Sequence, residues 1–343
     1  MSWKDLPGVK PGVVTGDVAW SLLRHAKKHG YAIPAFNCSS TGAINAVLEA
    51  GAKLDRPIMV QFSEGDAAFF VGASLPNQCY EASVLGAVAA AHYCRLVAAT
   101  YGATVFVHSD HCAKKLLPWL DGMLEADKAF FAAHGEPLFS SHMLGLSEED
   151  HAENVQICAD YLKKMAPMNL ILEVEIGNDQ FCSTPEDTLL VHDALAPISE
   201  KFTIAAAFGN ARGVHKPGRV KLQPELLGDF QRRAKEKLGG GDRPLFLVFH
   251  GGSGAAKEQI EQALRHGVVK VSVDTDTQWA YWLGVKTFYE ANEDKLQGQL
   301  GNNDGRDRPN KSYYDPRKWL REAETSMRDR AMECCKDVKN ISS

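Results

Sequence analysis

Eight short apolar segments, rich in residues that favour strands, recur along the chain and alternate with stretches that can form helices. Each segment ends in glycine or polar residues, and together they cover residues 32–36, 57–62, 104–107, 137–142, 170–176, 203–208, 245–249 and 268–273. Near-continuous apolar strands separated by helices are typical of a parallel sheet that is covered on both faces. Eight such strands predict a closed (β/α)8 TIM barrel, with a doubly wound open sheet as the alternative.

The segments between the strands and after them indicate one α/β domain. Residues 41–54 and 258–266 have the apolar spacing of surface helices, and the glycines at 239–241 predict a helix end. A chain of 343 residues accommodates one barrel, so we expect a single domain over 1–343. The charged and aromatic residues 286–343 predict a C-terminal helical extension that packs outside the barrel or against another subunit.

Composition argues against several classes of partner. The net charge of −5 provides no general attraction for nucleic acid or for an anionic membrane. The N-terminus lacks the apolar core of a signal peptide, and no apolar run looks long enough to cross a bilayer, so membrane insertion is not expected. The eight cysteines lack Cys-x-x-Cys spacing, which favours reduced thiols in the cytoplasm, or in an organelle after removal of a transit peptide.

Polar side chains cluster at the ends of the predicted strands. In a barrel the carboxyl ends of all strands meet on one face, where barrel enzymes hold their substrates. One shared site is therefore expected, drawing on Asn37, Ser63, His108, Asp110, His111, His142, Glu173, Glu175, Asn210, His250 and Asp274.

Three features at these strand ends suggest a metal next to an anion. His250 precedes Gly-Gly-Ser-Gly, whose backbone N–H groups favour a phosphate, although a plain tight turn has the same composition. Asp110 beside His111 pairs a proton-transfer group with a metal ligand, or else is a helix cap beside a packed histidine. Glu175 lies within an apolar strand, where a carboxylate is costly unless it is paired or bound to a cation.

His111, Glu175 and His250 together make a candidate zinc site of two imidazoles and one carboxylate with an open position. The other strand-end histidines, His108 and His142, and the more distant His192 are interpreted as packing or supporting residues.

Several motifs taken together resemble a known family, the type A class II fructose-1,6-bisphosphate aldolases. The similarity runs in order and with few gaps from the first strand to the C-terminal helices, through PAFNC, HSDHCAKKLLPW, LFSSHM, FGN with KPG, VFHGGSG, DTDTQWA, LQGQLGN and PNKSYYDPRKWLR. The resemblance implies a TIM barrel that cleaves fructose 1,6-bisphosphate to dihydroxyacetone phosphate and glyceraldehyde 3-phosphate, or acts on a related ketose bisphosphate.

The same resemblance implies residue roles. Asp110 would be the general acid/base, and His111, Glu175 and His250 would bind catalytic Zn2+, which stabilises the enediolate. Asp274 and Asn37 would hold hydroxyl groups, and Arg317 would reach the far phosphate across a homodimer interface. The ketose-side phosphate would be held by Ser63, Gly213, Lys216, Gly251, Ser253 and Thr275.

The chain departs from the family pattern at four places. Arg212 stands where the family has a third zinc histidine, and a guanidinium cannot donate a lone pair. Ser272 replaces the Asn that steadies the enediolate, and Gly145 replaces an Asp linked to a second metal position. The acidic loop expected after Glu175, which carries a catalytic Glu, is missing from the sequence.

These departures leave two hypotheses open. In the first, the protein is an impaired or non-catalytic homologue that keeps the sugar-phosphate site for binding or for a structural place in a larger assembly, with Arg212 filling the metal position. In the second, it is a working zinc aldolase with a displaced ligand such as His215. We favour the first from the ligand chemistry, and metal analysis with a cleavage assay separates the two.

Overall fold

The computed structural model describes residues 2–177, 182–210 and 222–340. Within these ranges one sheet contains parallel strands only. They are β1 Gly12–Val13, β2 Ile33–Asn37, β3 Ile58–Phe62, β4 Thr104–Cys112, β5 Ser141–Leu144, β6 Ile171–Ile176, β7 Phe202–Ala206, β8 Leu247–Phe249 and β9 Val268–Val273.

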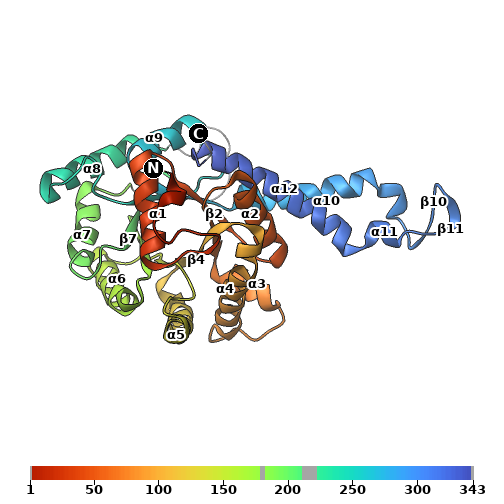
Figure 1. Cartoon of the computed structure of the whole chain (residues 1–343), viewed down its shortest axis with the longest axis horizontal. Helices are drawn as coiled ribbons and strands as arrows, with labels where there is room; N and C mark the ends of the chain where they lie inside the picture. Colours follow the sequence, from red (N-terminus) through yellow and green to blue (C-terminus); the bar gives the residue numbers. More distant parts are fainter. Residues whose placement is uncertain (1, 178–181, 211–221, 341–343) are drawn as a thin grey trace.

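Strands β2 to β9 close into a barrel, because β4 pairs with β3 on one side and with β5 on the other. The short β1 adds to the start of β4, with Gly12 opposite Thr104. Helices surround the strands (Figure 1). The predicted (β/α)8 TIM barrel is therefore confirmed, and the open sheet is excluded.

The helices of the described residues follow the strands in alternation and then continue into the extension. They are α1 Gly16–His29, α2 Thr41–Leu54, α3 Glu64–Val71, α4 Glu81–Tyr101, α5 Leu117–His134, α6 His151–Met165, α7 Pro185–Leu195, α8 Glu225–Leu238, α9 Lys257–Arg265, α10 Thr275–Ala291, α11 Lys311–Tyr314 and α12 Pro316–Asp337. As predicted, α2 spans 41–54, and α8 ends directly before Gly239, whose positive φ of 71° suits glycine.

The inward side chains change from apolar to polar along the barrel axis. Side chains alternate along a strand, so every second residue of a barrel strand points inward. Near the start of the strands, Ile33, Met59, Phe106 and Ile171 belong to a buried cluster that α1 covers with Trp20. Two residues further along β3, β4 and β6, the side chains are polar: Gln61, His108 and Glu173. The polar site therefore rests on an apolar plug.

Several predicted strand bounds need correction by one or two residues, and those of β4 and β5 by more. β4 continues to Cys112, beyond the predicted end at 107, because its polar residues still pair with β3 and β5. β5 begins at Ser141 rather than at 137, and of the residues before it Ser140 bonds through its backbone to Val107 and Ile171. An apolar run therefore marked where a strand lies but not where it ends.

Helix α4 is long and apolar enough to span a bilayer by length and composition, so the expectation that no apolar run reaches that length was wrong. The apolar character comes largely from alanines, and Ala87, Ala90 and Ala91 are buried. The helix packs on β4 with α3 and α5 beside it. At Gly86 an added Cβ would lie 1.7 Å from the backbone oxygen of Ala67, so this glycine permits the close approach of α3.

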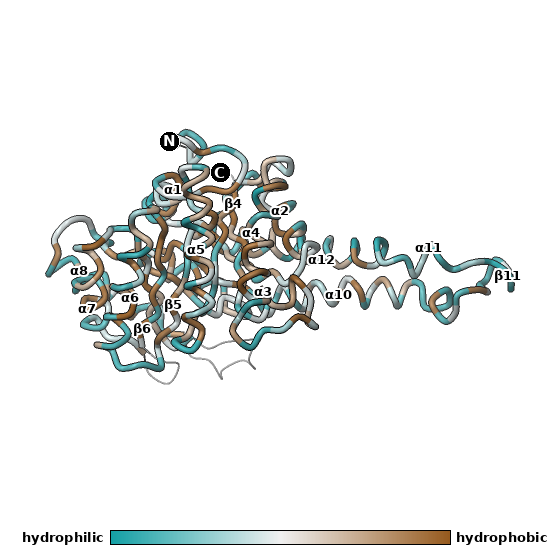
Figure 2. Tube along the Cα trace, turned by 90° about the horizontal axis from the view of Figure 1, so that it is seen from below, coloured by the Kyte–Doolittle hydropathy of each residue, from teal (hydrophilic) through white to brown (hydrophobic). Residues whose placement is uncertain are grey.

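The C-terminal part projects from the barrel as an arm. α10 starts directly after β9, and α12 returns beside it toward the barrel (Figures 1 and 2). The far end carries α11 and a hairpin of β10 Leu300–Asn302 and β11 Gly305–Pro309. Trp279 and Trp282 of α10 are 59% and 53% exposed, so the arm presents a large apolar surface that the described residues of this chain leave uncovered.

Candidate active site

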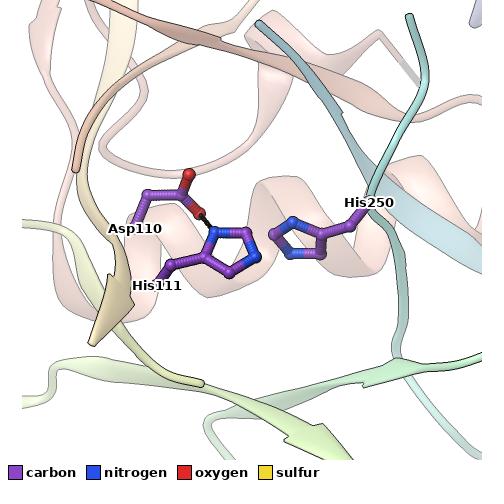
Figure 3. Close-up of side chains that lie close together, drawn as sticks. All are labelled: Asp110, His111 and His250. Carbon is purple, nitrogen blue, oxygen red and sulfur yellow. Dashed lines mark ion pairs between the residues drawn. The ribbon is translucent and has the colours of Figure 1, made fainter. Parts of the chain in front are cut away.

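The end of β4 places two consecutive functional side chains on the same side of the strand. The β4–β5 register shifts between Ser109 and Cys112, and His111 has a left-handed φ of 51°. An irregularity of this kind re-aims a side chain, and positive φ in a non-glycine residue is a strained conformation that clusters at functional sites. Asp110 and His111 therefore both face the barrel mouth instead of alternating (Figure 3).

His250 completes a compact group with these two residues. The His111 and His250 rings meet edge to face with centroids 4.6 Å apart, and Asp110 Oδ1 lies 2.9 Å from His111 Nδ1 (Figure 3). One donor atom from each of Asp110, His111 and His250 lies within 4.8 Å of the others. The structure thus brings together two of the predicted zinc ligands and the predicted acid/base.

Glu175 lies at the edge of this group, and its place as a ligand stays a prediction. Its Oε2 accepts a hydrogen bond from Ser147 Oγ at 3.0 Å, and it is not one of the three grouped donors. An added Cβ on Gly145 would lie 3.3 Å from Glu175 Oε2 and 3.5 Å from His111 Cα. Glu175 is therefore close to the backbone of His111, and the absent side chain at Gly145 leaves room between them.

The glycines after His250 allow backbone conformations and a close packing that a side chain would prevent. Gly251 and Gly254 have φ values of 79° and 75°, which favour glycine. At Gly252 an added Cβ would lie 2.6 Å from Val271 Cγ1 and 2.9 Å from Ser272 O, while its N–H bonds to that oxygen. The loop after His250 therefore packs closely on β9, and its residues Gly251 and Ser253 line the pocket at the barrel mouth.

A network of amides holds the Asp110 carboxylate. Asn37 Nδ2 donates to Asp110 Oδ2 at 3.3 Å, and Gln61 Nε2 donates to the same oxygen at 3.2 Å and to Asn37 Oδ1 at 2.6 Å. Burial raises the pKa of Asp110, but the charge and hydrogen bond of His111, with His250 and Lys270 behind it, hold this pKa well below its usual range. Asp110 is thus an ionised, oriented carboxylate.

A second polar layer lies beneath the grouped donors. Glu173 Oε1 is 2.6 Å from His250 Nε2, and its Oε2 accepts from Lys270 Nζ at 2.8 Å. Lys270 also lies 3.1 Å from His108 Nε2. Desolvation and Lys270 lower the pKa of His108 to about 3, so this imidazole is neutral. His108 is therefore a supporting residue, as predicted.

With the exception of Arg317, the predicted substrate-binding residues that the structure describes line one pocket of about 270 Å³ at the barrel mouth. Ser63 caps α3, and its hydroxyl donates to Asp66 at 2.6 Å. Ser253 accepts from the backbone of Asp276. Burial, and then the neighbouring Asp66, raise the pKa of Asp274 to about 6. The lining residues are Asn37, Gln61, Ser63, Asp66, Asp110, His111, His250, Gly251, Ser253, Ser272, Asp274, Thr275 and Gln278.

Ser272, which is predicted to replace an Asn of the family, lines this pocket. It is 7% exposed, and its Oγ has no hydrogen-bond partner among the described residues. Gln61 Oε1 is in the same situation. Buried polar atoms without partners are rare in folded proteins, so these two are candidates for contact with a ligand.

Five residues that the sequence analysis singled out lie elsewhere. Arg212, Gly213 and Lys216, together with the alternative ligand His215, lie outside the described residues. Arg317 lies in the first turn of α12 on the arm, where its side chain is 88% exposed, and it pairs with Asp315 and does not line the pocket of its own chain. Its predicted role therefore requires a second copy.

Gln61, Asp66 and Lys270 were not among the predicted functional residues, and Glu173 was placed in the shared site without a role of its own. The signal was present for three of them, because Gln61, Glu173 and Lys270 are polar or charged residues inside apolar strands, the criterion that had selected Glu175. His142 is fully buried on the outer side of β5, where it pairs with Asp127, and His192 packs on Phe202, in line with the packing interpretation.

Comparison with known proteins gives one consistent result. The family model described as Fructose-bisphosphate aldolase class-II matches residues 18–342. The fructose-bisphosphate aldolase of Haemophilus influenzae is 47% identical over 97% of this chain and 97% of that protein. The fructose-bisphosphate aldolase 1 of Paracoccidioides lutzii is 48% identical, covering 98% of each. The crystal structure of the Campylobacter jejuni fructose-bisphosphate aldolase matches with a TM-score of 0.94 and 46% identity, covering 99% of both chains.

Proposed function

Since the chain belongs to the class II fructose-bisphosphate aldolase family, we propose that its substrate is fructose 1,6-bisphosphate and that its reaction is aldol cleavage into two triose phosphates. The observation that carries the proposal is the meeting of Asp110, His111 and His250 within 4.8 Å at the barrel mouth. This face is where barrels hold their substrates.

The donor set at the mouth fits zinc. Two imidazoles and a neighbouring carboxylate are ligand types that zinc prefers, and the group is largely buried. We assign His111 and His250 as ligands, with Glu175 as the further carboxylate beside His111. When bound, the metal supplies Lewis-acid polarisation of the ketose carbonyl.

Asp110 moves the proton. Aldol cleavage requires a base that removes the proton of the hydroxyl group next to the carbon–carbon bond that breaks. An ionised carboxylate can accept this proton. The amides of Asn37 and Gln61 fix the Asp110 carboxylate, so it needs no reorientation before the transfer. Asp274 and Asn37 face the same pocket and are suited to bind the ketose hydroxyl groups.

Phosphate binding is shared between two places. Ser63, Gly251, Ser253 and Thr275 line the pocket on the side of the glycine motif, and Gly213 and Lys216 are proposed to join them. Arg317 from a second copy is proposed for the far phosphate. The exposed Trp279 and Trp282 of the arm support a homodimer, because an apolar surface of this kind commonly marks a protein contact.

We further propose that turnover is slow. Arg212 removes one imidazole from the family ligand set, and Ser272 offers a shorter hydroxyl where the family has a carboxamide. One oxyanion-type donor is worth roughly 10²–10³ in rate. These same two substitutions favour a second candidate function, a homologue that binds ketose phosphates without cleaving them.

The test combines metal analysis with a coupled assay for triose phosphate release from fructose 1,6-bisphosphate. We expect bound zinc and slow cleavage that a chelator abolishes and zinc restores. His250→Ala should lose both, whereas His192→Ala, which removes an imidazole packed on Phe202, should keep both. Cleavage that continues without metal would contradict the proposal, and a protein with neither zinc nor cleavage would leave the second candidate.

A further inference from the structure

The polar layer beneath the grouped donors is built around one carboxylate, Glu173. This side chain points into the barrel from β6 and is 2% exposed. Its two oxygens have separate partners, since Oε1 lies 2.6 Å from His250 Nε2 and Oε2 accepts from Lys270 Nζ at 2.8 Å. Glu173 therefore bridges the residue that follows β8 to a lysine of β9.

The hydrogen-bond directions across this layer are determined by elementary chemistry. An ammonium group only donates, so Lys270 donates to Glu173 and to His108 Nε2, 3.1 Å away. The neutral His108 then carries its proton on Nδ1, which donates to Ser141 Oγ at 2.7 Å. Each member of this chain of contacts holds the next one in place.

The same reasoning assigns the tautomer of His250. An ionised carboxylate only accepts, so the hydrogen between Glu173 and His250 belongs to Nε2 of the imidazole. In the neutral ring the lone pair is then on Nδ1. A histidine that donates one ring N–H to a carboxylate is oriented and made a stronger donor to a metal at the other nitrogen.

We infer that Glu173 is a positioning residue for metal binding: it fixes His250 as the Nε2–H tautomer with Nδ1 offered to the metal, while Lys270 balances its buried charge. This inference rests on the proposed function, because it deepens the metal site assigned there. Glu173 is distinct from Glu175, which contacts Ser147 and which the sequence analysis predicts to be a ligand.

The barrel contains a matched pair that serves as a control. Asp127 Oδ2 lies 2.8 Å from His142 Nε2, and both side chains are 0% exposed, but neither lines the pocket at the barrel mouth. Replacing Asp127 with Asn perturbs a buried carboxylate–imidazole contact of the same kind without reaching the metal site.

The experiment measures zinc affinity by competition with a chromophoric chelator, alongside the melting temperature of the metal-free protein. Glu173→Gln keeps the shape of the side chain and removes its charge, and we expect zinc affinity to fall about 10–100-fold. Because this variant leaves Lys270 buried without its counter-ion, the double variant Glu173→Gln, Lys270→Met is measured beside it to preserve folding. It should show the same loss of affinity.

Asp127→Asn should lower the melting temperature and leave zinc affinity unchanged. Glu173 variants that fold and bind zinc as tightly as the unmodified protein would overturn the inference alone. Unmodified protein that binds no zinc would overturn the proposed metal site and, with it, this inference. An equal loss of affinity in Asp127→Asn would show that any buried defect weakens the site and would also overturn it.

Discussion

Gly86→Ala should destabilise the barrel by forcing α3 away from α4. The new Cβ would lie 1.7 Å from the Ala67 oxygen and 2.6 Å from its carbonyl carbon, and both atoms are backbone. Overpacking of this kind costs about 1–3 kcal/mol, while alanine in place of glycine inside a helix returns about 0.5–1 kcal/mol. We expect a net loss of about 1–2 kcal/mol in the free energy of unfolding.

The consequence should extend to the active site. Ala67 follows Asp66, which accepts hydrogen bonds from Ser63 and from Asn37, and Asn37 in turn holds Asp110. A displaced α3 therefore disturbs the network around the acid/base. Gly86→Ala should lower ligand affinity at the barrel mouth as well as stability.

The assay is urea and thermal unfolding followed by circular dichroism, with Gly65→Ala as the control. An added Cβ at Gly65, also in a helix of this region, meets no atom within 4 Å, so that variant should be neutral or slightly stabilising. Equal unfolding midpoints for Gly86→Ala and the unmodified protein would show that the contact with Ala67 does not limit stability, and an equal loss in Gly65→Ala would show the same.

Three further outcomes are expected. Ser272→Asn should raise the cleavage rate at least tenfold by restoring the carboxamide to the pocket; an unchanged rate in the coupled assay counts against slow turnover from this position. Trp282→Arg should convert a dimer to monomers in analytical ultracentrifugation, and an unaltered sedimentation coefficient would remove the arm from the interface. Because the pKa of Asp274 is raised to about 6, its carboxylate is protonated below that pH, so KM should rise as pH falls through 6; a profile identical in Asp274→Asn would exclude this residue.

The barrel was predictable because its strands are buried on both faces. Such strands read as apolar runs, and the predicted run at 268–273 coincides with β9. The ends of the strands were harder to predict from the sequence, because β4 continues through the polar residues His108 to His111 and still pairs with its neighbours there. The irregularity that turns Asp110 and His111 to the same side is a pairing feature between two strands, and no local pattern reveals it.

The sequence predicted the two imidazoles of the site but not the residues that hold them in place. His111 and His250 were selected because imidazoles at strand ends suit a metal, and they do meet. Glu175 was selected as the ligand because it lies within an apolar strand, yet Glu173 of the same strand is the carboxylate that contacts His250. Glu173 and Lys270 are far apart in the sequence. Only the closed barrel therefore shows that these two residues form a buried ion pair.

The proposed zinc site is tested most directly by anomalous diffraction at the zinc absorption edge from crystals of the protein equilibrated with zinc. We expect one strong peak at the barrel mouth, within about 2.0–2.1 Å of a ring nitrogen of His111 and of His250 Nδ1. Crystals that hold zinc elsewhere and show no anomalous density between these two rings would contradict the proposed site.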